Sequence, residues 1–378
     1  MRDLFVTTHT PVLGTGQAVR TYGVARALAT HRELDLLYVR FGETQPDAAF
    51  RAIPGITLHE VVPSRGLRRL LTYASARASG VPKGFARGIS PELAREARRL
   101  AEVPDRGRVI ADGPITAAAL TPLARRRPVI YNAHNLESGF RADVSGASST
   151  HAEALLSFER GLLARAAESW MVSEPDLQGA REVCAEATLR YVPNVVDVEA
   201  ITPVSPYAGE PRGVFVASFT YLPNRNGLRF LLDEVMPLVW RQLPQAQLAL
   251  VGGGLVGGGL RQPPSDDPRV QALGFVPDLR DAYANAACAV VPLLEGGGTP
   301  LKLIEALAYG LPVIATPRAA AGLQLRDGEH CLIAGDAHAF ATALVRVLRD
   351  GAPEIARAGR ELARERFSIE ALSTLVAP

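Results

Sequence analysis

The sequence predicts an α/β fold with two domains, each built around a parallel sheet that is covered by helices on both faces. A chain of 378 residues is too long for one ordinary core. The composition, with 47% hydrophobic and 21% charged residues, is typical of a globular protein. Both halves begin with a short apolar run and continue with helical periodicity. Strand, turn, helix and strand in this order form a βαβ unit, whose strands are parallel.

The first half starts with such a unit. We expect a strand at residues 4–8, a turn at Gly14–Thr15–Gly16, a helix at 17–30 and a second strand at 34–39. The remaining elements expected in this half are strands at 109–111, 129–132 and 170–173 and a helix at 153–167.

The second half repeats the pattern with a strand at 213–218, a helix at 226–243 and a strand at 246–252. Between the halves, residues 197–212 carry three prolines and little periodicity, so we expect domains at 1–198 and 199–365. The other expected elements are strands at 270–273, 287–292 and 312–316, a helix at 299–309, and a short amphipathic helix at 367–376.

The location of the protein is predicted from its cysteines and its apolar segments. Cys184, Cys288 and Cys331 are far apart and have neither disulfide nor metal-site spacing, which fits a reducing compartment. The N-terminus has no apolar signal core, and no window has the roughly 18 unbroken apolar residues of a membrane span. We therefore expect a cytoplasmic protein without a metal site, and allow peripheral contact with the inner face of a membrane.

Positive charge is concentrated at residues 61–110, where eleven Arg or Lys face four Asp or Glu, although the whole chain has a net charge of only +2. One interpretation is a solvated helical face, and the other is a patch that attracts anionic lipid head groups or an acidic acceptor. Nucleic acid is not expected as a partner, because the stretch has few aromatic residues for stacking. The cluster includes Arg65, Arg68, Arg69, Arg95, Arg98 and Arg99.

Residues 290–316 carry the most informative pattern. An apolar strand ends in Gly296–Gly297–Gly298, after which Thr299 is expected as the N-cap, Pro300 as the first helical residue and Gly310 as the C-terminal glycine of a helix. A glycine loop at the positive end of a helix offers backbone N–H groups to an anion such as a diphosphate.

Lys302 and Glu305 are three residues apart on this helix and so lie on one face. Lys302 can neutralise a phosphate, while Glu305 can accept hydrogen bonds from the two hydroxyls of a ribose. Only two of the 41 basic residues are lysines, which suggests that a compact ammonium is needed here. The alternative is an ordinary strand-to-helix turn with a Lys–Glu pair on the surface.

The stretch GGGTPLKLIEALAYGLPVIAT resembles the nucleotide-binding signature of the family 4 glycosyltransferases, in the branch that reads Gly-Gly-Gly-Thr-x-Leu-Lys-x-x-Glu-Ala. Other segments resemble this family in its own order, so that the resemblance covers essentially the whole chain. They are YNAHNLES (131–138), FERGLLARAAESWMVSEPD (158–176), VPNVVD (192–197), VASFTYLPNRNGLRFLLDEVMP (216–237) and GFVPDLRDAY (274–283).

The resemblance implies the GT-B architecture, in which two Rossmann-like domains face each other across a cleft and a C-terminal helix, here 366–378, crosses back to the first domain. It also implies a hexosyltransferase-like, retaining, metal-independent enzyme without a cofactor. The donor is then a nucleotide diphosphate sugar bound by 199–365. The acceptor, bound on the side of 1–198, is a glycan, a lipid-linked intermediate or a small molecule.

The resemblance also assigns roles to single residues. Glu305 matches the glutamate that holds the donor ribose, and Lys302 matches the lysine at the diphosphate. His134 matches a histidine near the transferred sugar. Further donor contacts correspond to the backbone of Gly297, Gly298 and Thr299, to Gly14 and Gly16 of the first domain, and to Phe275 and Val276 in the loop that faces the base.

Two departures from the family pattern affect this site. The wider family has a glutamate eight positions before the ribose glutamate, where this chain has Gly297, and Glu295 lies two residues too early to replace it directly. An Arg and a Lys that grip the diphosphate in the wider family have only Arg225 and Arg229 as candidates here.

Three other interpretations remain. His134 could be an ordinary structural histidine at a strand end. The protein could be a sugar-nucleotide epimerase of the same architecture, or a relative that binds nucleotide sugars without catalysis. A dinucleotide oxidoreductase is less favoured, because Gly14 and Gly16 lack the third glycine of the dinucleotide fingerprint.

Overall fold

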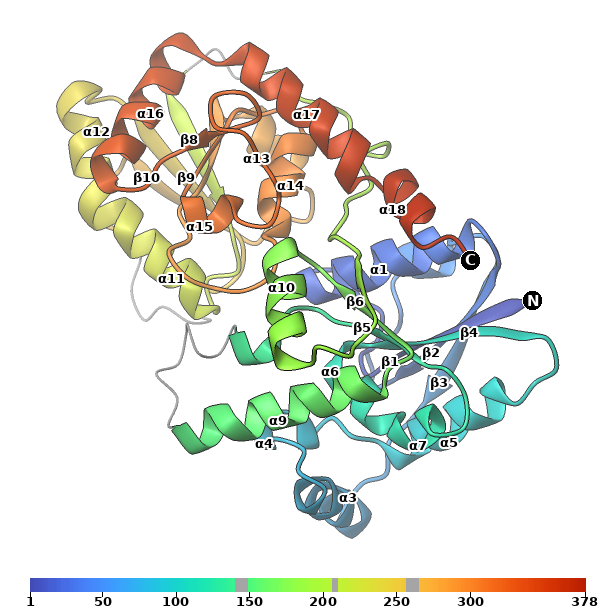
Figure 1. The fold of residues 1–378 in the computed structure, drawn as a ribbon. Helices are drawn as coiled ribbons and strands as arrows, with labels where there is room; N and C mark the ends of the chain where they lie inside the picture. The colour runs from blue at the N-terminus through green and yellow to red at the C-terminus, as the bar shows by residue number, and fades with distance from the viewer. Residues whose placement is uncertain (140–148, 206–209, 256–264) are drawn as a thin grey trace. The chain divides into compact units, whose positions relative to one another are not determined.

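The computed structural model describes residues 1–139, 149–205, 210–255 and 265–378, with the side chains of 149–151 left out. The chain forms two compact units (Figure 1). Unit 1 comprises Met1–Val195 and Ile369–Pro378, and unit 2 comprises Val196–Ser368. The chain thus passes from unit 1 to unit 2 and returns for its last ten residues. These divisions lie three residues from the expected ones at 198 and 366.

Unit 1 contains a sheet of seven strands in the order β3-β2-β1-β4-β5-β6-β7. Every neighbouring pair in this sheet is parallel. The strands are β1 (Arg2–Thr7), β2 (Glu33–Val39), β3 (Ile56–Val61), β4 (Arg106–Asp112), β5 (Ile130–Asn132), β6 (Glu168–Met171) and β7 (Leu189–Tyr191).

Alternate residues of the central strand β1 enter different cores, because successive side chains of a strand point to opposite faces. Phe5 joins the core that contains α1 residues, whereas Leu4 and Val6 join the core that contains Leu93 of α5. The helices are α1 (Gly16–Ala29), α2 (Ala48–Arg51), α3 (Leu67–Ala78), α4 (Lys83–Ala86), α5 (Pro91–Ala101), α6 (Gly113–Ala119), α7 (Thr121–Ala124), α9 (Ser149–Arg165), α10 (Glu174–Val183) and α18 (Ile369–Leu375).

The returning helix α18 is part of the core of unit 1. Its Ile369 and Leu372 are buried with Val24 and Leu28 of α1, and the two helices lie side by side (Figure 1). The expected final helix at 367–376 is therefore present as a slightly shorter element.

Unit 2 contains a sheet of six parallel strands in the order β10-β9-β8-β11-β12-β13. The strands are β8 (Arg212–Val216), β9 (Gln247–Val251), β10 (Val270–Gly274), β11 (Cys288–Val291), β12 (Val313–Ala315) and β13 (Leu332–Ile333). The helices are α11 (Leu222–Arg229), the π-helix η1 (Phe230–Val235), α12 (Met236–Gln242), α13 (Arg280–Ala284), α14 (Leu301–Ala308), α15 (Pro317–Ala320), α16 (Ala337–Asp350) and α17 (Pro353–Phe367).

The prediction of two α/β domains with parallel sheets is confirmed. The prediction of one regular helix at 226–243 is wrong, because α11, η1 and α12 follow one another with a π-helical segment in the middle. Pro237 has no amide hydrogen and cannot donate to the carbonyl four residues earlier, which favours the wider π turn just before it. In the part of the chain that the structure describes, no helix is both long and apolar enough to cross a membrane.

Candidate functional site

The strand orders indicate a candidate ligand site in each unit. In both sheets the order reverses beside the first strand, between β1 and β4 in unit 1 and between β8 and β11 in unit 2. Ligands of open parallel sheets bind outside the carboxyl ends of the strands at such a switch point. The residues that follow these strands are therefore the candidates.

In unit 1, Asp112 at the end of β4 lies beside His134, which follows β5. The His134 Nε2 atom is 2.8 Å from Asp112 Oδ1. Asn132 Nδ2 donates to the same oxygen at 2.7 Å, and Thr21 Oγ1 donates to Oδ2 at 2.7 Å. Because an ionised carboxylate only accepts, the proton of this contact belongs to Nε2 of His134.

These donors keep Asp112 ionised although it is fully buried. Burial raises the pKa of this carboxyl, but the charge and the hydrogen bond of His134, together with the bond from Thr21, outweigh burial and bring the pKa to about 2. Gly113 has φ +81°, and a Cβ atom there would lie 3.0 Å from Cε1 of His134. A glycine after Asp112 therefore leaves room for the imidazole ring.

Arg20 of α1 brings a buried positive charge to the same network. Its guanidinium donates to Asn132 Oδ1 at 2.6 Å and to the carbonyl of Val192 at 3.0 Å. Burial lowers its pKa to about 10, and the charge of Asp112 opposes this shift. Asn132 thus links the two charged residues, because it accepts a hydrogen bond from Arg20 and donates one to Asp112.

Gly14 lies on the exposed turn between β1 and α1, and Gly16 is the exposed first residue of α1. Gly14 has φ +124°, and Thr15 caps the helix by accepting a hydrogen bond from the Ala18 amide at 3.2 Å. The predicted turn thus places the N-terminus of α1 at the carboxyl edge of the sheet. This edge also carries Asp112 and His134.

A hollow of about 360 Å³ opens beside this edge of unit 1. Hydroxyl groups and an imidazole form its polar side, and Phe41 and Ile115 contribute apolar walls. None of these residues was among the site residues expected from the sequence. The lining residues are Thr8, His9, Thr10, Val12, Phe41, Thr44, Gly88 and Ile115.

In unit 2, the glycine loop precedes α14 as expected, but the helix begins later than predicted. Pro300, not Thr299, is the N-cap, and Leu301 is the first helical residue. The expectation for Thr299 and Pro300 is therefore wrong. A proline ring fixes φ but leaves ψ free, and Pro300 with ψ 107° closes the loop instead of opening the helix.

The other end of α14 agrees with the prediction. Gly310 has φ +79°, its amide donates to the carbonyl of Leu307, and the Leu311 amide donates to that of Ala306. This pair of bonds is a Schellman motif, in which glycine takes the left-handed position.

Lys302 is held by neutral partners from two other elements. Its ammonium donates to Asn224 Oδ1 of α11 and lies 5.2 Å from the ring centroid of Phe215 in β8. Among the described residues, no carboxylate lies within ion-pair distance of it. Burial lowers the pKa of Lys302 to about 7, and the charge of Glu305 opposes part of that shift.

Glu305 shares the helix with Lys302 without touching it. Burial raises the pKa of this carboxyl to about 7, and Lys302 opposes the shift. Two tyrosines lie near, with the ring centroids of Tyr283 and Tyr309 4.7 Å apart. Burial, and next the charge of Glu305, raise the pKa of Tyr283 well above its usual value. No hydrogen bond to Glu305 is formed by the described side chains.

The remaining predicted donor contacts of unit 2 lie on several loops and helices. Phe275 follows β10 and is 74% exposed, whereas Val276 packs against the core. Gly297 is exposed and Gly298 has φ +67°. Thr299 is buried. These positions stay predictions as donor contacts.

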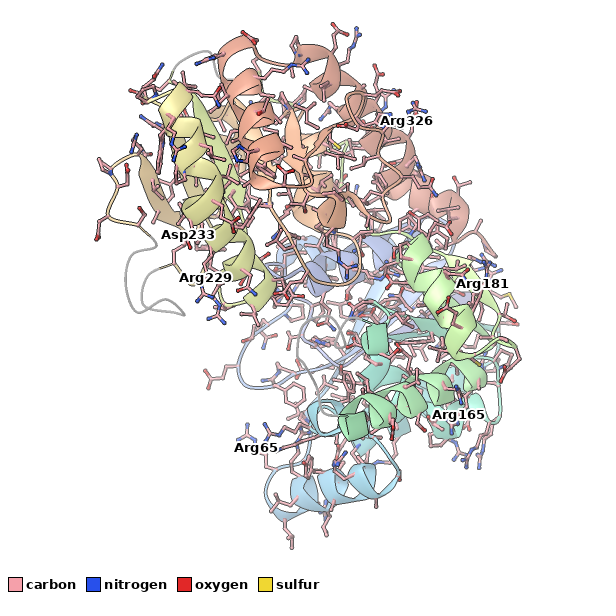
Figure 2. All side chains as sticks on the ribbon, turned by 60° about the vertical axis from the view of Figure 1, so that its left-hand side comes forward. Arg65, Arg165, Arg181, Arg229, Asp233 and Arg326 are labelled. Carbon is pink, nitrogen blue, oxygen red and sulfur yellow. The ribbon has the colours of Figure 1, made fainter. Side chains whose placement is uncertain are left out.

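The three charged candidates differ in their surroundings. Glu295 accepts a hydrogen bond from Asn226 Nδ2 of α11 at 2.6 Å. Arg225 is half-buried, and Arg229 is exposed and points away from the ribbon (Figure 2). The guanidinium of Arg225 has no hydrogen bond or ion pair with another described residue.

Part of the positive charge at 61–110, three of the eleven basic residues, is compensated within α5. Arg95, Arg98 and Arg99 form ion pairs with Glu92, Glu102 and Glu96, respectively. Arg69 lies over the Phe41 ring at 5.2 Å and donates to the carbonyl of Arg87. Arg65 and Arg68 are exposed, and Figure 2 shows Arg65 projecting from the loop before α3.

Sequence reasoning missed Asp112, Arg20 and Asn224. Asp112 had a local signal, because an aspartate followed by glycine ends an apolar strand. Arg20 and Asn224 had none, because each is one polar residue of a helix and its partners are distant in the sequence. Residues 1–139, 149–205, 210–255 and 265–378 contain no group of three or more His, Cys, Asp or Glu that could hold a metal ion.

The match to a protein family lies in unit 2. Residues 210–350 match the family model of glycosyl transferases group 1. The phosphatidyl-myo-inositol mannosyltransferase of Mycobacterium leprae is 34% identical over 171 residues, which are 42% of this chain and 44% of that protein. The enzyme of the same name from Mycolicibacterium smegmatis is 31% identical over 196 residues. The matched segments span less than half of these relatives, 44% and 48%.

Solved structures match along the whole chain. Sucrose-phosphate synthase from Thermosynechococcus elongatus has a TM-score of 0.73 at 20% identity and covers 99% of this chain and 96% of its own. HepE from Anabaena, solved with UDP-glucose, has a TM-score of 0.69 at 16% identity and covers 100% and 98%. The chain therefore has the GT-B fold, and its residues 210–350 match the glycosyl transferases of group 1.

Proposed function

We propose that this protein is a glycosyltransferase that moves a sugar, with retention, from a nucleotide diphosphate sugar to an acceptor. The observation that carries the proposal is the pair Lys302 and Glu305 on α14, beside the switch point of unit 2 and inside the family match. The names of the similar proteins support it, since they include mannosyltransferases and a structure solved with UDP-glucose.

The donor would be held by unit 2. The Lys302 ammonium has no carboxylate partner among the described residues, so its charge is available to a diphosphate. The backbone of Gly297, Gly298 and Thr299 would add N–H groups, Arg225 a second cation, and Glu305 would accept from the ribose hydroxyls. Phe275 and Val276 would face the base.

In the proposed reaction the acceptor hydroxyl attacks the anomeric carbon on the face from which the diphosphate leaves. The bond from carbon to the diphosphate oxygen breaks, and its electron pair stays on that oxygen. The acceptor proton passes to the same oxygen, so no enzyme base is needed. Lys302 stabilises the charge of the leaving group, and no metal ion is assigned a part in the step.

Unit 1 would supply the acceptor side. His134, oriented by Asp112, is proposed to contact the transferred sugar, and Gly14 and Gly16 to approach the donor phosphate. The hollow between Thr8 and Ile115 combines hydroxyl groups with an apolar wall, which suits an acceptor that has both a hydroxylated and an apolar part.

We also propose that α3 brings the enzyme to an anionic membrane surface. Leu67, Leu70 and Leu71 of this helix are 71%, 64% and 61% exposed. Arg65 and Arg68 are exposed beside them. Neither arginine forms an ion pair with another described residue. Exposed leucines next to such arginines are typical of helices that lie in the lipid interface. The contact would be peripheral and reversible.

Replacing Glu305 tests the donor site. In Glu305→Ala we expect the affinity for the cognate nucleoside diphosphate to fall at least about tenfold, because a hydrogen bond to a charged group contributes about 1.5–3 kcal/mol. Calorimetric titrations with UDP, GDP, ADP and dTDP measure it. Glu234→Ala, which removes an exposed glutamate of the same unit, is the control.

Unchanged affinity in a folded Glu305→Ala protein removes Glu305 from the site, and wild-type protein that binds none of the four nucleotides contradicts the donor assignment. With the matching sugar nucleotide, formation of a product with the donor's anomeric configuration, followed by NMR, tests transfer with retention. Isomerised donor without any acceptor would point to an epimerase.

A further inference from the structure

The ammonium of Lys302 depends on one side chain of α11 for its position. Asn224 is 5% exposed, and its Oδ1 atom accepts a hydrogen bond from Lys302 Nζ. An amide oxygen has a partial charge only, so this contact holds the ammonium without neutralising it. A carboxylate at this place would form an ion pair and compete with a bound diphosphate.

The orientation of the Asn224 amide is determined by a backbone group. Its Nδ2 atom donates to the carbonyl of Ser218 at 2.7 Å. A carbonyl can only accept, so the nitrogen must face Ser218 and the oxygen must face Lys302. The side chain therefore cannot rotate by half a turn without losing both bonds.

The Ser218 carbonyl belongs to a loop that is clamped by the end of β9. The Ala217 and Phe219 amides each donate at 2.8 Å, to the carbonyls of Val251 and Gly253. A Cβ atom on Gly252 would lie 1.9 Å from the Ala217 oxygen, and one on Gly254 would lie 2.8 Å from the amide nitrogen of Thr220. Glycines thus allow the two loops to touch and keep the Ser218 carbonyl in place.

We propose that Asn224 is a positioning residue of the donor site, which aims the Lys302 ammonium and leaves its charge uncompensated for a diphosphate. The inference rests on the proposed function, because it takes the ligand of Lys302 to be the diphosphate of a nucleotide. Two N–H groups of the ammonium remain for phosphate oxygens after the bond to Asn224.

The charge state of Lys302 is the readout that separates this role from a purely structural one. The electrostatic influence on it comes from Glu305 of its own helix, while β8 and α11 present the neutral Phe215 ring and the Asn224 amide. The chain has only two lysines, Lys83 and Lys302. Protein labelled with ¹³C at the lysine ε-carbon therefore gives two NMR signals, and Lys83→Arg assigns them.

The experiment follows both lysine signals against pH in wild type, Asn224→Asp and Asn224→Leu, without nucleotide and with millimolar UDP, GDP, ADP or dTDP. A carboxylate beside Lys302 should raise its pKa by about one pH unit or more. Leucine should lower that pKa, because the ammonium loses its acceptor. In both variants we expect the affinity for the nucleotide to fall at least about tenfold, while exposed Lys83 titrates unchanged.

Asn285→Asp is the matched control. It makes the same substitution in unit 2 at an exposed residue, the C-cap of α13, whose side-chain amide donates to the backbone carbonyl of Asp281. We expect it to move the Lys302 titration much less than Asn224→Asp does.

The possible failures are distinguishable. Identical Lys302 titrations in wild type, Asn224→Asp and Asn224→Leu overturn the inference, because Asn224 then does not act on the ammonium. A clear effect of Asn224→Asp, combined with a wild-type Lys302 signal that responds to none of UDP, GDP, ADP and dTDP, instead overturns the proposed nucleotide site.

Discussion

Single buried charges show how the candidate sites are organised at the residue scale. Asp112 is an anion stabilised by three side-chain donors, and Lys302 is a cation without an anionic partner among the described residues. The charge of Asp112 is compensated by its donors, so this arrangement favours the folded protein. The second leaves charge available to a ligand, which fits a binding group better than a structural one.

Asp112→Asn is expected to destabilise unit 1. The pKa of Asp112 is about 2, against an ordinary 3.8, and this difference corresponds to about 2 kcal/mol of stability at neutral pH. Because the folded pKa is depressed, the contribution is present above about pH 4 and is lost as the pH falls toward 2. The loss in free energy of unfolding that Asp112→Asn causes should therefore become smaller as the pH falls.

Urea unfolding measures this effect, with Trp170 as the reporter of unit 1 in a Trp240→Phe background. Asp105→Asn is the control, because Asp105 is an exposed aspartate of the same unit with φ +59°, which asparagine tolerates. If the difference in free energy of unfolding between wild type and Asp112→Asn is the same at pH 7 and pH 3, the ionised carboxylate does not stabilise the fold.

At the scale of elements, α3 differs from α5 although both are rich in arginine. The α5 arginines pair with glutamates three or four residues away, which is the usual pattern of a solvated helix. The arginines at the start of α3 stand beside exposed leucines instead. The basic residues of 61–110 therefore belong to two different surfaces, the paired surface of α5 and the leucine-rich surface of α3.

We expect the protein to sediment with anionic phospholipid vesicles at low salt, and much less at raised salt or with neutral vesicles. An arginine near an anionic surface contributes about 1 kcal/mol, within a Debye length of roughly 10 Å. Arg65→Ala/Arg68→Ala and Leu67→Ser/Leu71→Ser should each reduce binding at least about fivefold.

Arg95→Ala/Arg98→Ala removes the same number of charges from α5 and should leave vesicle binding nearly unchanged. If wild-type protein does not bind anionic vesicles at low salt, α3 is an ordinary solvated helix and a soluble acceptor is favoured. If both double arginine variants lose vesicle binding to the same extent, the net charge of the protein and not α3 causes the attraction.

At the scale of the whole molecule, the sheets of both units have the same strand order. In each sheet the order reverses beside the first strand, so each unit has loops at one edge of its sheet that can bind a ligand. The proposed division assigns the donor to unit 2 and the acceptor to unit 1. A ligand that binds one unit should stabilise that unit first.

Donor binding and transfer are expected to persist in EDTA, because the positive charge at the diphosphate is assigned to Lys302 and backbone N–H groups. At 100 times its Kd, the cognate nucleotide should stabilise unit 2, reported by Trp240 in a Trp170→Phe background, by about 2.7 kcal/mol. If EDTA abolishes transfer and the stabilisation by the nucleotide, and Mg²⁺ or Mn²⁺ restores them, a metal ion and not Lys302 neutralises the diphosphate.

The sequence by itself determined the classes of element and their order. The alternation of apolar runs, turns and helical stretches predicted parallel sheets in two domains, and Gly310 predicted the end of α14, because these features depend on neighbours in the chain. The exact start of α14 at Leu301 was missed, since the ψ angle of Pro300 is not set by its own ring.

Only the tertiary structure decided which side chains meet at the sites. Lys302 and Asn224 are 78 residues apart, and Asp112 and Thr21 are 91 apart. Such pairs come together because the strand order places the ends of distant strands side by side, which local periodicity does not encode. The availability of the Lys302 charge follows from these contacts, so composition and spacing could indicate this lysine as a candidate but not its electrostatic state.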